Sequence, residues 1–421
     1  MLDLKFIREN ADSVRQNISN KNESADVDFI IHNDERRRAI IGEVEALKNH
    51  RNVVTKEIGN LKKNNLNADD QMKAMKEVSD NIKSLDEELA TIQDKIDEAL
   101  LKIPNMVHSS VPVGKTPEDN PDIRRWGNFK EQKKQFDHME IAKMHDIIDF
   151  ERGAKVSGSG FHYYVGKGAT LERALINYML DFHTEKHGYR ETFSPFIVNR
   201  ESMIGTGQLP KMAEDMYFAQ EDGLYLIPTA EVPLTNFFSK ETLKAEELPK
   251  KVCGYSPCFR REAGSYGKDT RGLLRVHQFN KVELVKLVDP ANSYDELENL
   301  VIDVEDVLKD LGLPYRLILL CTGDTSFSSA KTYDLEVWAP GENKFLEVSS
   351  CSNFESFQSR RAGIRFKPTP SSKPEFVHTL NGSGLATPRM MVAILENNID
   401  ENGVVWIPEP LRQYTKFDRI G

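Results

Sequence analysis

Two runs of apolar residues in the first quarter of the chain alternate three- and four-residue spacings, as coiled-coil seams do. The first run has one gap, filled by Arg51, and consists of Ile40, Val44, Leu47, Val54, Ile58 and Leu61. The second is unbroken and consists of Met75, Val78, Ile82, Leu85, Leu89, Ile92, Ile96, Ala99 and Ile103. A period of about 3.5 residues over this length predicts two long helices that pack along their apolar stripes.

The segment between these runs, KKNNLNADD, is rich in Asn and Asp, which is typical of a turn. A short turn makes antiparallel neighbours of the two helices that it joins. The sequence therefore predicts an antiparallel helical hairpin over roughly residues 28–103, within an N-terminal domain of residues 1–103. At about 1.5 Å per residue, the hairpin reaches roughly 45–55 Å from a larger globular body.

Charge is distributed unevenly along this hairpin. From Lys48 to Lys76 the chain has seven basic and three acidic residues. Residues 28–47 have three basic and five acidic residues, and residues 77–98 have two basic and eight acidic residues. The basic residues of the distal half are Lys48, Arg51, Lys56, Lys62, Lys63, Lys73 and Lys76. This pattern indicates that a polyanion binds near the tip of the hairpin. On charge alone, a solvated helix face or dimerisation through the hairpin remains an alternative.

The rest of the chain is long enough for at least one further domain. Residues 104–127 contain four prolines and no periodicity, so residues 104–135 are predicted to be an extended linker. In residues 136–421, helical patterns occur at 138–152, 169–187, 293–311 and 386–398, and strand-like runs are FHYYVG, LYLIP, KVELVKLV, YRLILLC and NKFLEVSS. Several strands follow one another without a helix, which favours an antiparallel sheet flanked by helices.

Composition and motifs exclude several classes of protein. No apolar run approaches the roughly 18 residues that span a bilayer, and MLDLKFIREN lacks a signal-peptide core, so the cytoplasm is the expected compartment. The net charge of −10 argues against nonspecific nucleic-acid binding by the whole surface. Neither GxGxxG before a helix nor GxxxxGK[ST] occurs. Four cysteines without a CxxC pair (Cys253, Cys258, Cys321 and Cys351) favour buried thiols over disulfides or structural zinc.

Residues 258–286 hold the densest group of charged side chains. It consists of Arg260, Arg261, Arg271, Arg275, Glu262 and Glu283, with the aromatic Phe279. The turn-rich YGKDTRG between two strand-like runs predicts an antiparallel hairpin. On such a hairpin guanidinium groups can clamp phosphates in a bidentate manner, and an aromatic ring can stack on a base. A salt-bridge ladder on an exposed sheet is the alternative.

Two other segments offer ligand-binding groups. In FLEVSS, Glu347 and Ser350 provide the hard oxygen ligands that suit Mg²⁺ on phosphates, although a lone glutamate on a half-exposed strand is common. In HTLNGSGLATPRMMVAILEN, an Asn-Gly-Ser-Gly turn is predicted to precede an apolar helix with Arg389 in its first turn. The helix dipole disfavours a cation there, so a ligand-facing role and a plain surface position are both open. His277 and Cys351 are predicted to be structural.

Together these segments resemble the three signature motifs of class II aminoacyl-tRNA synthetases. HGYRETFSPFIV, with Pro195, is similar to motif 1, CFRREAG to motif 2, and GLATPRMMVAILEN to motif 3. Within this class the chain resembles the bacterial-type seryl-tRNA synthetase family over essentially its whole length. The hairpin and the segments GTGQLPK, PTAEVPLTN, CTGDTSFSSAKTYDLEVW and FLEVSSCSNF carry that resemblance. It implies an α+β fold, with an antiparallel sheet flanked by helices as the catalytic domain of residues 136–421 and the coiled-coil arm before it.

The resemblance also implies an activity and partners. The enzyme would activate L-serine with ATP and Mg²⁺, and then transfer serine to tRNA-Ser, and to tRNA-Sec as well. Motif 1 would build a homodimer, with tRNA bound across the subunits. A family form that binds serine through zinc is disfavoured, because the metal-ligand cysteines are missing. Ser383 stands where some relatives have Thr, and the hydroxyl is retained.

The implied site residues fall into three groups. Arg260 and Arg389 would be catalytic, and the ATP site would comprise Arg260, Arg261, Glu262, Arg275, Val276, Phe279, Glu347, Val348, Ser349, Ser350 and Arg389. Phe279 and Arg389 would enclose the adenine, Arg275 would contact the γ-phosphate, and Glu347 with Ser350 would hold Mg²⁺. Serine would be bound by Thr229, Ala230, Glu231, Arg260, Glu283, Asn381 and Ser383.

Two other functions are compatible with parts of the sequence. A synthetase paralogue could activate an amino acid and load a carrier other than tRNA, but it would have no use for a basic, tRNA-reaching arm. A coiled-coil tether with a degenerate synthetase body would not be expected to keep Arg260, Glu262, Glu283, Glu347 and Arg389 together.

Overall fold

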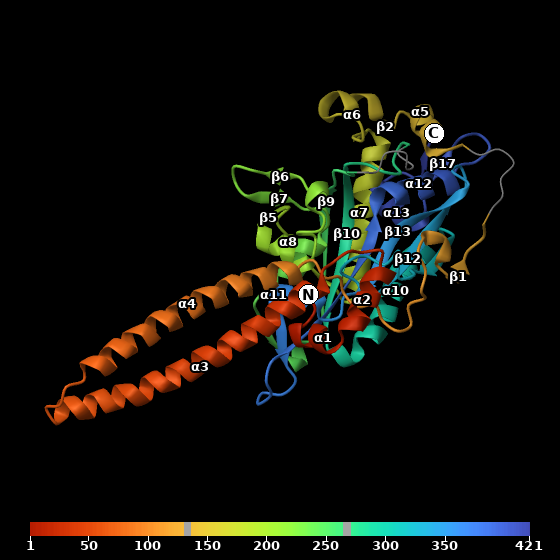
Figure 1. The fold of residues 1–421 in the computed structure, drawn as a ribbon. Helices are drawn as coiled ribbons and strands as arrows, with labels where there is room; N and C mark the ends of the chain where they lie inside the picture. Colours follow the sequence, from red (N-terminus) through yellow and green to blue (C-terminus); the bar gives the residue numbers. More distant parts are fainter. Residues whose placement is uncertain (130–135, 264–270) are drawn as a thin grey trace. The chain divides into compact units, whose positions relative to one another are not determined.

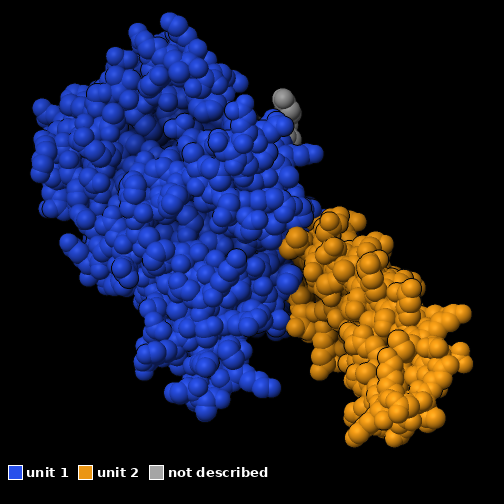
Figure 2. All heavy atoms as spheres, turned by 90° about the vertical axis from the view of Figure 1, so that its left-hand side faces the viewer, with its two compact units in different colours: residues 1, 20–22, 105–421 blue, residues 2–19, 23–104 orange. Residues whose placement is uncertain are grey.

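The computed structural model describes residues 1–129, 136–263 and 271–421, so most of the predicted YGKDTRG loop lies outside the described residues. The chain forms two units, coloured separately in Figure 2. Unit 1 contains residues 1, 20–22 and 105–421, and unit 2 contains residues 2–19 and 23–104. Within the described ranges, none of the helices combines the length and the apolar character that a membrane span requires.

Unit 2 is helical, and its two long helices form the predicted antiparallel hairpin (Figure 1). Its helices are α1 (Leu4–Glu9), α2 (Ala11–Asn20), α3 (Val27–Lys63) and α4 (Asp69–Leu100). The 37 residues of α3 span about 55 Å. At the turn, Asn65 adopts a positive φ of 56°, and the Asn67 side chain accepts a hydrogen bond from the Asp69 amide at 2.8 Å. The Asn-rich composition of the turn is thus explained.

The heptad positions form the seam between α3 and α4. Ile40, Val44, Ile82, Leu85 and Ile92 are buried, and the seam positions nearer the tip are half-buried. The two helices are also joined by a bidentate ion pair, in which Arg36 donates to Glu88 at 2.8 and 2.9 Å. The heptad periodicity therefore predicted the contact, and the short turn predicted its antiparallel direction.

Unit 1 is built on an eight-stranded sheet in the order β1-β11-β12-β13-β16-β10-β9-β4. Every neighbouring pair is antiparallel except β4 with β9. The strands are β1 (Asp122–Trp126), β4 (Arg190–Glu191), β9 (Lys250–Phe259), β10 (Gln278–Val288), β11 (Tyr315–Leu319), β12 (Lys331–Ala339), β13 (Lys344–Asn353) and β16 (His378–Ala386). The predicted hairpin of residues 258–286 is the pair β9–β10.

Helices cover one face of this sheet, and the other face carries the site. The covering helices are α7 (Lys167–His187), α10 (Ser293–Asp310) and α12 (Thr387–Asn397). In β10, Val282 and Leu284 join the core beneath these helices, whereas Val285 and Leu287 pack into a second core with α9 (Glu231–Asn236). Phe279, Lys281 and Glu283 share this second face, because side chains alternate along a strand.

Smaller elements complete unit 1. Its remaining helices are α5 (His138–His145), α6 (Phe150–Ser157), α8 (Arg200–Thr206), α11 (Phe357–Ala362) and α13 (Glu409–Thr415), and its 3₁₀ turns are η1 (Pro117–Asp119), η2 (Ala213–Asp215), η3 (Ala245–Glu247) and η4 (Pro290–Asn292). Its remaining strands are β2 (Ile148–Asp149), β3 (Tyr163–Tyr164), β5 (Ile197–Val198), β6 (Phe218–Ala219), β7 (Leu224–Leu226), β8 (Thr242–Lys244), β14 (Arg365–Lys367), β15 (Glu375–Phe376), β17 (Val405–Trp406) and β18 (Arg419–Ile420).

Three sequence-based expectations differ from this structure. The helix predicted at 138–152 is two helices, because Asp146 ends α5 in the left-handed conformation and Asp149 caps α6. The stretch 104–135, predicted as a linker, contributes the edge strand β1, which pairs with β11. The predicted Asn-Gly-Ser-Gly turn at 381–384 is part of the central strand β16.

The gap in the heptad pattern supplies a prediction about the hairpin. Arg51 occupies a half-buried seam position, so Arg51→Leu should stabilise the contact between α3 and α4 by about 0.5–1 kcal/mol through added apolar burial. Amide exchange over residues 47–61, measured by mass spectrometry, should slow roughly two- to five-fold. Lys56→Leu, at an exposed position of the same helix, is the matched control and should not slow it. Unchanged or faster exchange in Arg51→Leu would contradict a continuous seam.

Candidate active site

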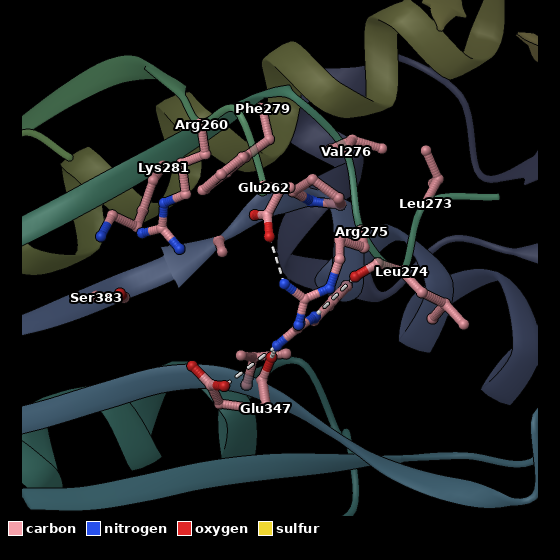
Figure 3. A pocket seen from close by; sticks show the side chains of 14 residues that line it. Arg260, Glu262, Leu273, Leu274, Arg275, Val276, Phe279, Lys281, Glu347 and Ser383 are labelled. Atoms are coloured by element: carbon pink, nitrogen blue, oxygen red, sulfur yellow. Dashed lines mark hydrogen bonds and ion pairs between the residues drawn. The ribbon is translucent and has the colours of Figure 1, made fainter. Parts of the chain in front are cut away.

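A cavity of about 170 Å³ lies between the β9–β10 hairpin, β13 and the first turn of α12 (Figure 3). It brings together residues that the sequence places far apart. The predicted ATP-site residues that line it are Arg260, Glu262, Arg275, Val276, Phe279, Glu347, Val348 and Arg389. Leu273, Leu274, Lys281 and Pro388 also line it, and their sequence context had not singled them out.

Arg260 and Phe279 form the upper side of this cavity in Figure 3. The guanidinium carbon of Arg260 lies 5.1 Å from the centre of the Phe279 ring, and its Nε donates to the Pro228 carbonyl at 3.3 Å. His277 lies opposite Arg260 across the hairpin. The Arg260 amide donates to the His277 carbonyl at 2.9 Å, and His277 Nδ1 lies 3.0 Å from the Arg260 carbonyl. His277 thus fixes the backbone that presents Arg260.

Glu262 and Arg275 form an ion pair at the cavity wall. Glu262 has a positive φ of 51°, and the backbone amides on both sides of it donate to Asp215. The Arg261 amide donates to the Asp215 carbonyl at 2.9 Å, and the Ala263 amide donates to the Asp215 carboxylate at 2.8 Å. Asp215 therefore holds the turn that aims Glu262 at Arg275. The Arg261 side chain is exposed and lines neither this cavity nor the next.

Arg389 lies in the first turn of α12 and is held by acceptors from two other segments. Its Nη1 donates to the Glu347 carbonyl at 2.7 Å and lies 3.4 Å from the Glu347 carboxylate, and its Nε donates to the Leu274 carbonyl at 3.3 Å. These acceptors offset the unfavourable helix dipole at this position. Of the two interpretations of Arg389, the structure supports the one in which it faces the cavity.

A second cavity of about 500 Å³ adjoins the first, and six residues line both: Arg260, Glu262, Arg275, Lys281, Glu347 and Ser383. The predicted serine-site residues that line this second cavity are Thr229, Glu231, Arg260, Glu283, Asn381 and Ser383. Ala230 is fully buried and does not line it. The two cavities therefore share a wall that contains two arginines, two glutamates, a lysine and a serine.

Glu283 lines the second cavity, is buried, and has partners at one of its carboxylate oxygens. The Thr229 hydroxyl donates to its carboxylate at 2.9 Å, and Lys281 Nζ lies 2.5 Å from the same oxygen. Lys281 was missed from the sequence, yet a signal was present. It lies two residues before Glu283 on one strand, and therefore on the same face.

Glu231, at the start of α9, is also buried beside Glu283. Burial, reinforced by the charge of Glu283, raises the pKa of Glu231 to about 7. Gln358 Nε2 donates to its carboxylate at 2.6 Å, and the Thr379 hydroxyl in turn donates to Gln358 Oε1 at 2.7 Å. Gln358 comes from α11, more than a hundred residues away in sequence, and nothing in its local pattern identified it.

A bulge in β13 decides where its acidic and hydroxyl side chains point. Glu336 pairs with Glu347 and Leu335 with Ser349, so Val348 is the extra residue. Residues three apart on a regular strand face opposite sides, but the bulge brings Glu347 and Ser350 to the same cavity. Ser349 faces away, and its hydroxyl donates to the Ser383 carbonyl at 2.7 Å.

These oxygen atoms fit a hard divalent cation. Ser350 donates to the Asp334 carboxylate, and burial, together with the Glu347 charge, raises the pKa of Asp334. The buried carboxylate of Asp334, the exposed carboxylate of Glu347 and the Ser350 hydroxyl form the kind of donor set that Mg²⁺ accepts beside phosphates. The four cysteines are buried. Burial raises the pKa of Cys253 to about 12 and also raises the pKa of the Cys258 and Cys351 thiols, so these three are not poised for nucleophilic chemistry.

Comparison with known proteins agrees with this arrangement. Residues 1–107 match the seryl-tRNA synthetase N-terminal domain, and residues 216–398 match the class II tRNA synthetase core domain (G, H, P, S and T). The serine--tRNA ligase of Carboxydothermus hydrogenoformans is 55% identical over 100% of this chain and 99% of its own length. This chain belongs to the seryl-tRNA synthetase family.

Solved structures of this family have the same fold. Seryl-tRNA synthetase from Pyrococcus horikoshii, complexed with ATP, aligns with a TM-score of 0.96 and 38% identity over 100% of this chain and 99% of that one. Cytoplasmic serine-tRNA ligase from Naegleria fowleri, in complex with AMP, aligns with a TM-score of 0.90 and 30% identity over 100% of this chain and 98% of that one. The predicted fold class and family are thereby confirmed for both the helical arm and the sheet.

The elevated pKa of Glu231 predicts how stability depends on pH. Its folded pKa lies above the ordinary value, so the neutral carboxyl is favoured, and that stabilisation is lost as the pH rises through about 7. Glu231→Gln cannot ionise. The free energy of unfolding of Glu231→Gln should therefore rise relative to that of the wild type as the pH increases from about 5 to 7, by at most about 1.4 kcal/mol per pH unit, and the difference should level off above pH 7. A difference that stays constant over this range would contradict an elevated pKa.

Proposed function

We propose that this member of the seryl-tRNA synthetase family activates L-serine with ATP and then transfers serine to tRNA-Ser. The observation that carries this proposal is the wall that the two cavities share. One has an aromatic ring and several guanidinium groups, which suit a nucleotide, and the other has buried carboxylates and hydroxyls, which suit a small polar amino acid. Arg260 lies at their junction, where the two substrates would react.

The side chains account for the first step. The serine carboxylate attacks the α-phosphorus of ATP in line, and pyrophosphate leaves, so that seryl-adenylate remains. The nucleophile is already an anion and needs no general base. Charge gathers on the phosphate oxygens, and the fixed guanidinium groups of Arg260 and Arg389 stabilise it. In the second step the terminal ribose hydroxyl of tRNA attacks the adenylate carbonyl, and AMP leaves.

A divalent cation fits the oxygen ligands beside the phosphate region. Glu347 and Ser350 would hold it, with Asp334 behind Ser350. When bound, Mg²⁺ supplies charge neutralisation on the phosphates of ATP. We propose Mg²⁺ because the donors are hard oxygens only.

The second cavity explains a preference for serine. Glu231 offers a carboxylate to the substrate ammonium group, and Glu283 with Ser383 offers partners to its hydroxyl. Alanine would leave these buried partners unpaired, a loss worth roughly 10⁴–10⁵ in discrimination where such pairing dominates. Threonine has to be excluded by fit, where one methyl group is worth only about 1–3 kcal/mol.

Substitution of Arg260 tests the role of its guanidinium group in the first step. Arg260→Ala should lower serine-dependent ATP–pyrophosphate exchange at least about 100-fold, because a fixed charge on the transition state is lost. Its melting temperature should change little, since the side chain makes one backbone hydrogen bond. Arg200→Ala, at the exposed start of α8, is the matched control. Near-normal exchange by Arg260→Ala would refute its role.

The arm supports tRNA as the acceptor. Lys48, Lys56, Lys62, Lys63, Lys73 and Lys76 are exposed, and Arg51 is half-buried. Within the described residues, Lys48 is the only one of these seven in an ion pair, 3.8 Å from Asp86. Exposed cations along about half of a long hairpin suit the phosphate backbone of an RNA helix. We therefore propose that this half of the arm binds tRNA-Ser.

Replacing all seven of these residues by Gln tests this surface. Serine-dependent exchange should remain at the wild-type level, whereas tRNA charging should weaken. Its salt dependence should flatten by roughly one unit of log–log slope for each phosphate that the variant no longer binds. The double variant Lys83→Gln, Lys95→Gln, in the acidic basal part of α4, is the control. Unchanged charging would leave the basic half without a role, and exchange without charging in the wild type would favour a carrier other than tRNA.

We also propose a homodimer that binds tRNA across its subunits, as motif 1 implies. Its support is apolar exposure in the motif 1 segment, where Phe193 is 77% and Ile197 51% exposed. Exposed apolar side chains that cluster in one short segment are typical of an interface. Charging of tRNA-Sec and a cytoplasmic location stay predictions of the same kind, as do the boundaries of the three predicted segments.

A further inference from the structure

His138, at the start of α5, joins three segments that lie far apart in the sequence. It is fully buried, and its Nε2 accepts a hydrogen bond from the Leu273 amide at 3.3 Å. Its Nδ1 lies 3.3 Å from Glu396 on α12 and 3.1 Å from Glu342, in the turn between β12 and β13. The imidazole therefore links the segment that leads into β10 with the carboxylates behind the first cavity.

The direction of these hydrogen bonds assigns the protons. Because Nε2 accepts from the Leu273 amide, the proton of a neutral imidazole is on Nδ1, from which it is donated toward the carboxylates. A metal ion bound at Nδ1 would require the imidazole proton to be on Nε2. Two N–H donors, those of Nε2 and of the Leu273 amide, would then face each other. The cluster is consequently a hydrogen-bonded support and not a metal site.

Glu396 is held firmly enough to orient the imidazole. Its carboxylate accepts from the backbone amides of His138 and Gly341, each at 2.9 Å, and from that of Glu342 at 3.2 Å. The residue is only 1% exposed. A buried carboxylate with several donors is fixed in position, and so is the ring that donates to it.

Helix α12 thus holds two adjacent residues of the cavity wall. From its first turn, Arg389 donates to the Leu274 carbonyl at 3.3 Å. From its last turn, Glu396 holds His138, which accepts from the Leu273 amide. Leu273 and Leu274 line the first cavity, and Arg275 follows them directly. Their backbone is therefore fixed from both ends of one helix.

The glycine before this wall shows how closely the imidazole approaches. A Cβ at Gly272 would lie 2.2 Å from His138 Nε2 and 2.6 Å from Met139 Sδ, and its φ is +58°. A side chain there would have to displace the imidazole. The close approach is consequently a second, independent sign that His138 determines the path of residues 272–275.

We propose that His138, oriented by Glu396, is a positioning residue for ATP: it sets the wall formed by Leu273, Leu274 and Arg275 against which the nucleotide binds. This inference rests on the proposed placement of ATP in the first cavity. His138 does not line either cavity and acts only through the backbone that it holds. Loss of this support should therefore weaken the binding of ATP. The binding of serine, which lies in the second cavity, should be nearly unaffected.

The test measures KM for ATP and for serine separately in pyrophosphate exchange by the full chain. His138→Leu removes both hydrogen bonds. Loss of the one from the Leu273 amide, which holds the cavity wall, should raise KM for ATP about ten-fold, with KM for serine changed less than about two-fold. His138→Gln, which restores an acceptor, should recover part of the loss. His145→Gln is the matched control. His145 is in the same helix, but its Nε2 lies 2.7 Å from the Gly403 carbonyl, away from the cavity wall.

Two further variants keep the test decisive. Gly272→Ala should raise KM for ATP in the same way, and it replaces His138→Leu if that variant does not fold. An unchanged KM for ATP in the folded variants, or an equal rise for both substrates, would overturn the positioning role. Phe279→Ala separates this failure from that of the proposed ATP placement, since an unchanged KM for ATP in Phe279→Ala would refute the placement itself.

Discussion

The site depends on how closely α7 and α10 approach the central strand β16. A Cβ at Gly382 would lie 2.9 Å from Cys351 Sγ and 3.3 Å from Leu300, and one at Gly384 would lie 3.1 Å from His183. Glycine removes side chains from the helix-covered face, so the helices can pack directly on the strand. The alternate positions, Asn381 and Ser383, then face the cavity. One strand thus supplies both the closest packing of the core and two of the polar groups of the site.

The cavity holds its cations by pairing them with its own anions. Glu262 pairs with Arg275, and the Glu347 carboxylate lies 3.4 Å from Arg389. Arg275 and Arg389 are therefore placed before any phosphate arrives, which reduces the rearrangement that binding requires. A polyanionic ligand would compete for these cations with the carboxylates. A divalent cation at Glu347 would relieve that competition, because it would take over the carboxylate that a phosphate displaces.

Patterns local in sequence predicted the parts of the molecule that local physics determines. The hairpin follows from heptad spacing and an Asn-rich turn, and the β9–β10 pair follows from a charged run around a turn. The Asn-Gly-Ser-Gly segment was misinterpreted because glycine serves both turns and close packing, and only the neighbours Leu300 and His183 distinguish the two. Gln358 was missed because its contact with Glu231 depends on tertiary packing alone. The positions around the nucleotide cavity came from family resemblance, which periodicity could not have replaced.

Strand register is the condition that makes these separate segments one site. Glu283 lies opposite Ser383 on one side and Gly254 on the other, and a slip of one residue would turn Glu283 into the helix-covered core. In β13 the register is interrupted instead. Glu347 and Ser350 are three residues apart and would face opposite sides of a regular strand, but the bulge at Val348 brings them to the same side. The chemistry therefore requires a regular register in β10 and an interrupted one in β13. This explains why a buried, helix-backed sheet, which resists slippage, carries residues that a flexible loop could not hold in place.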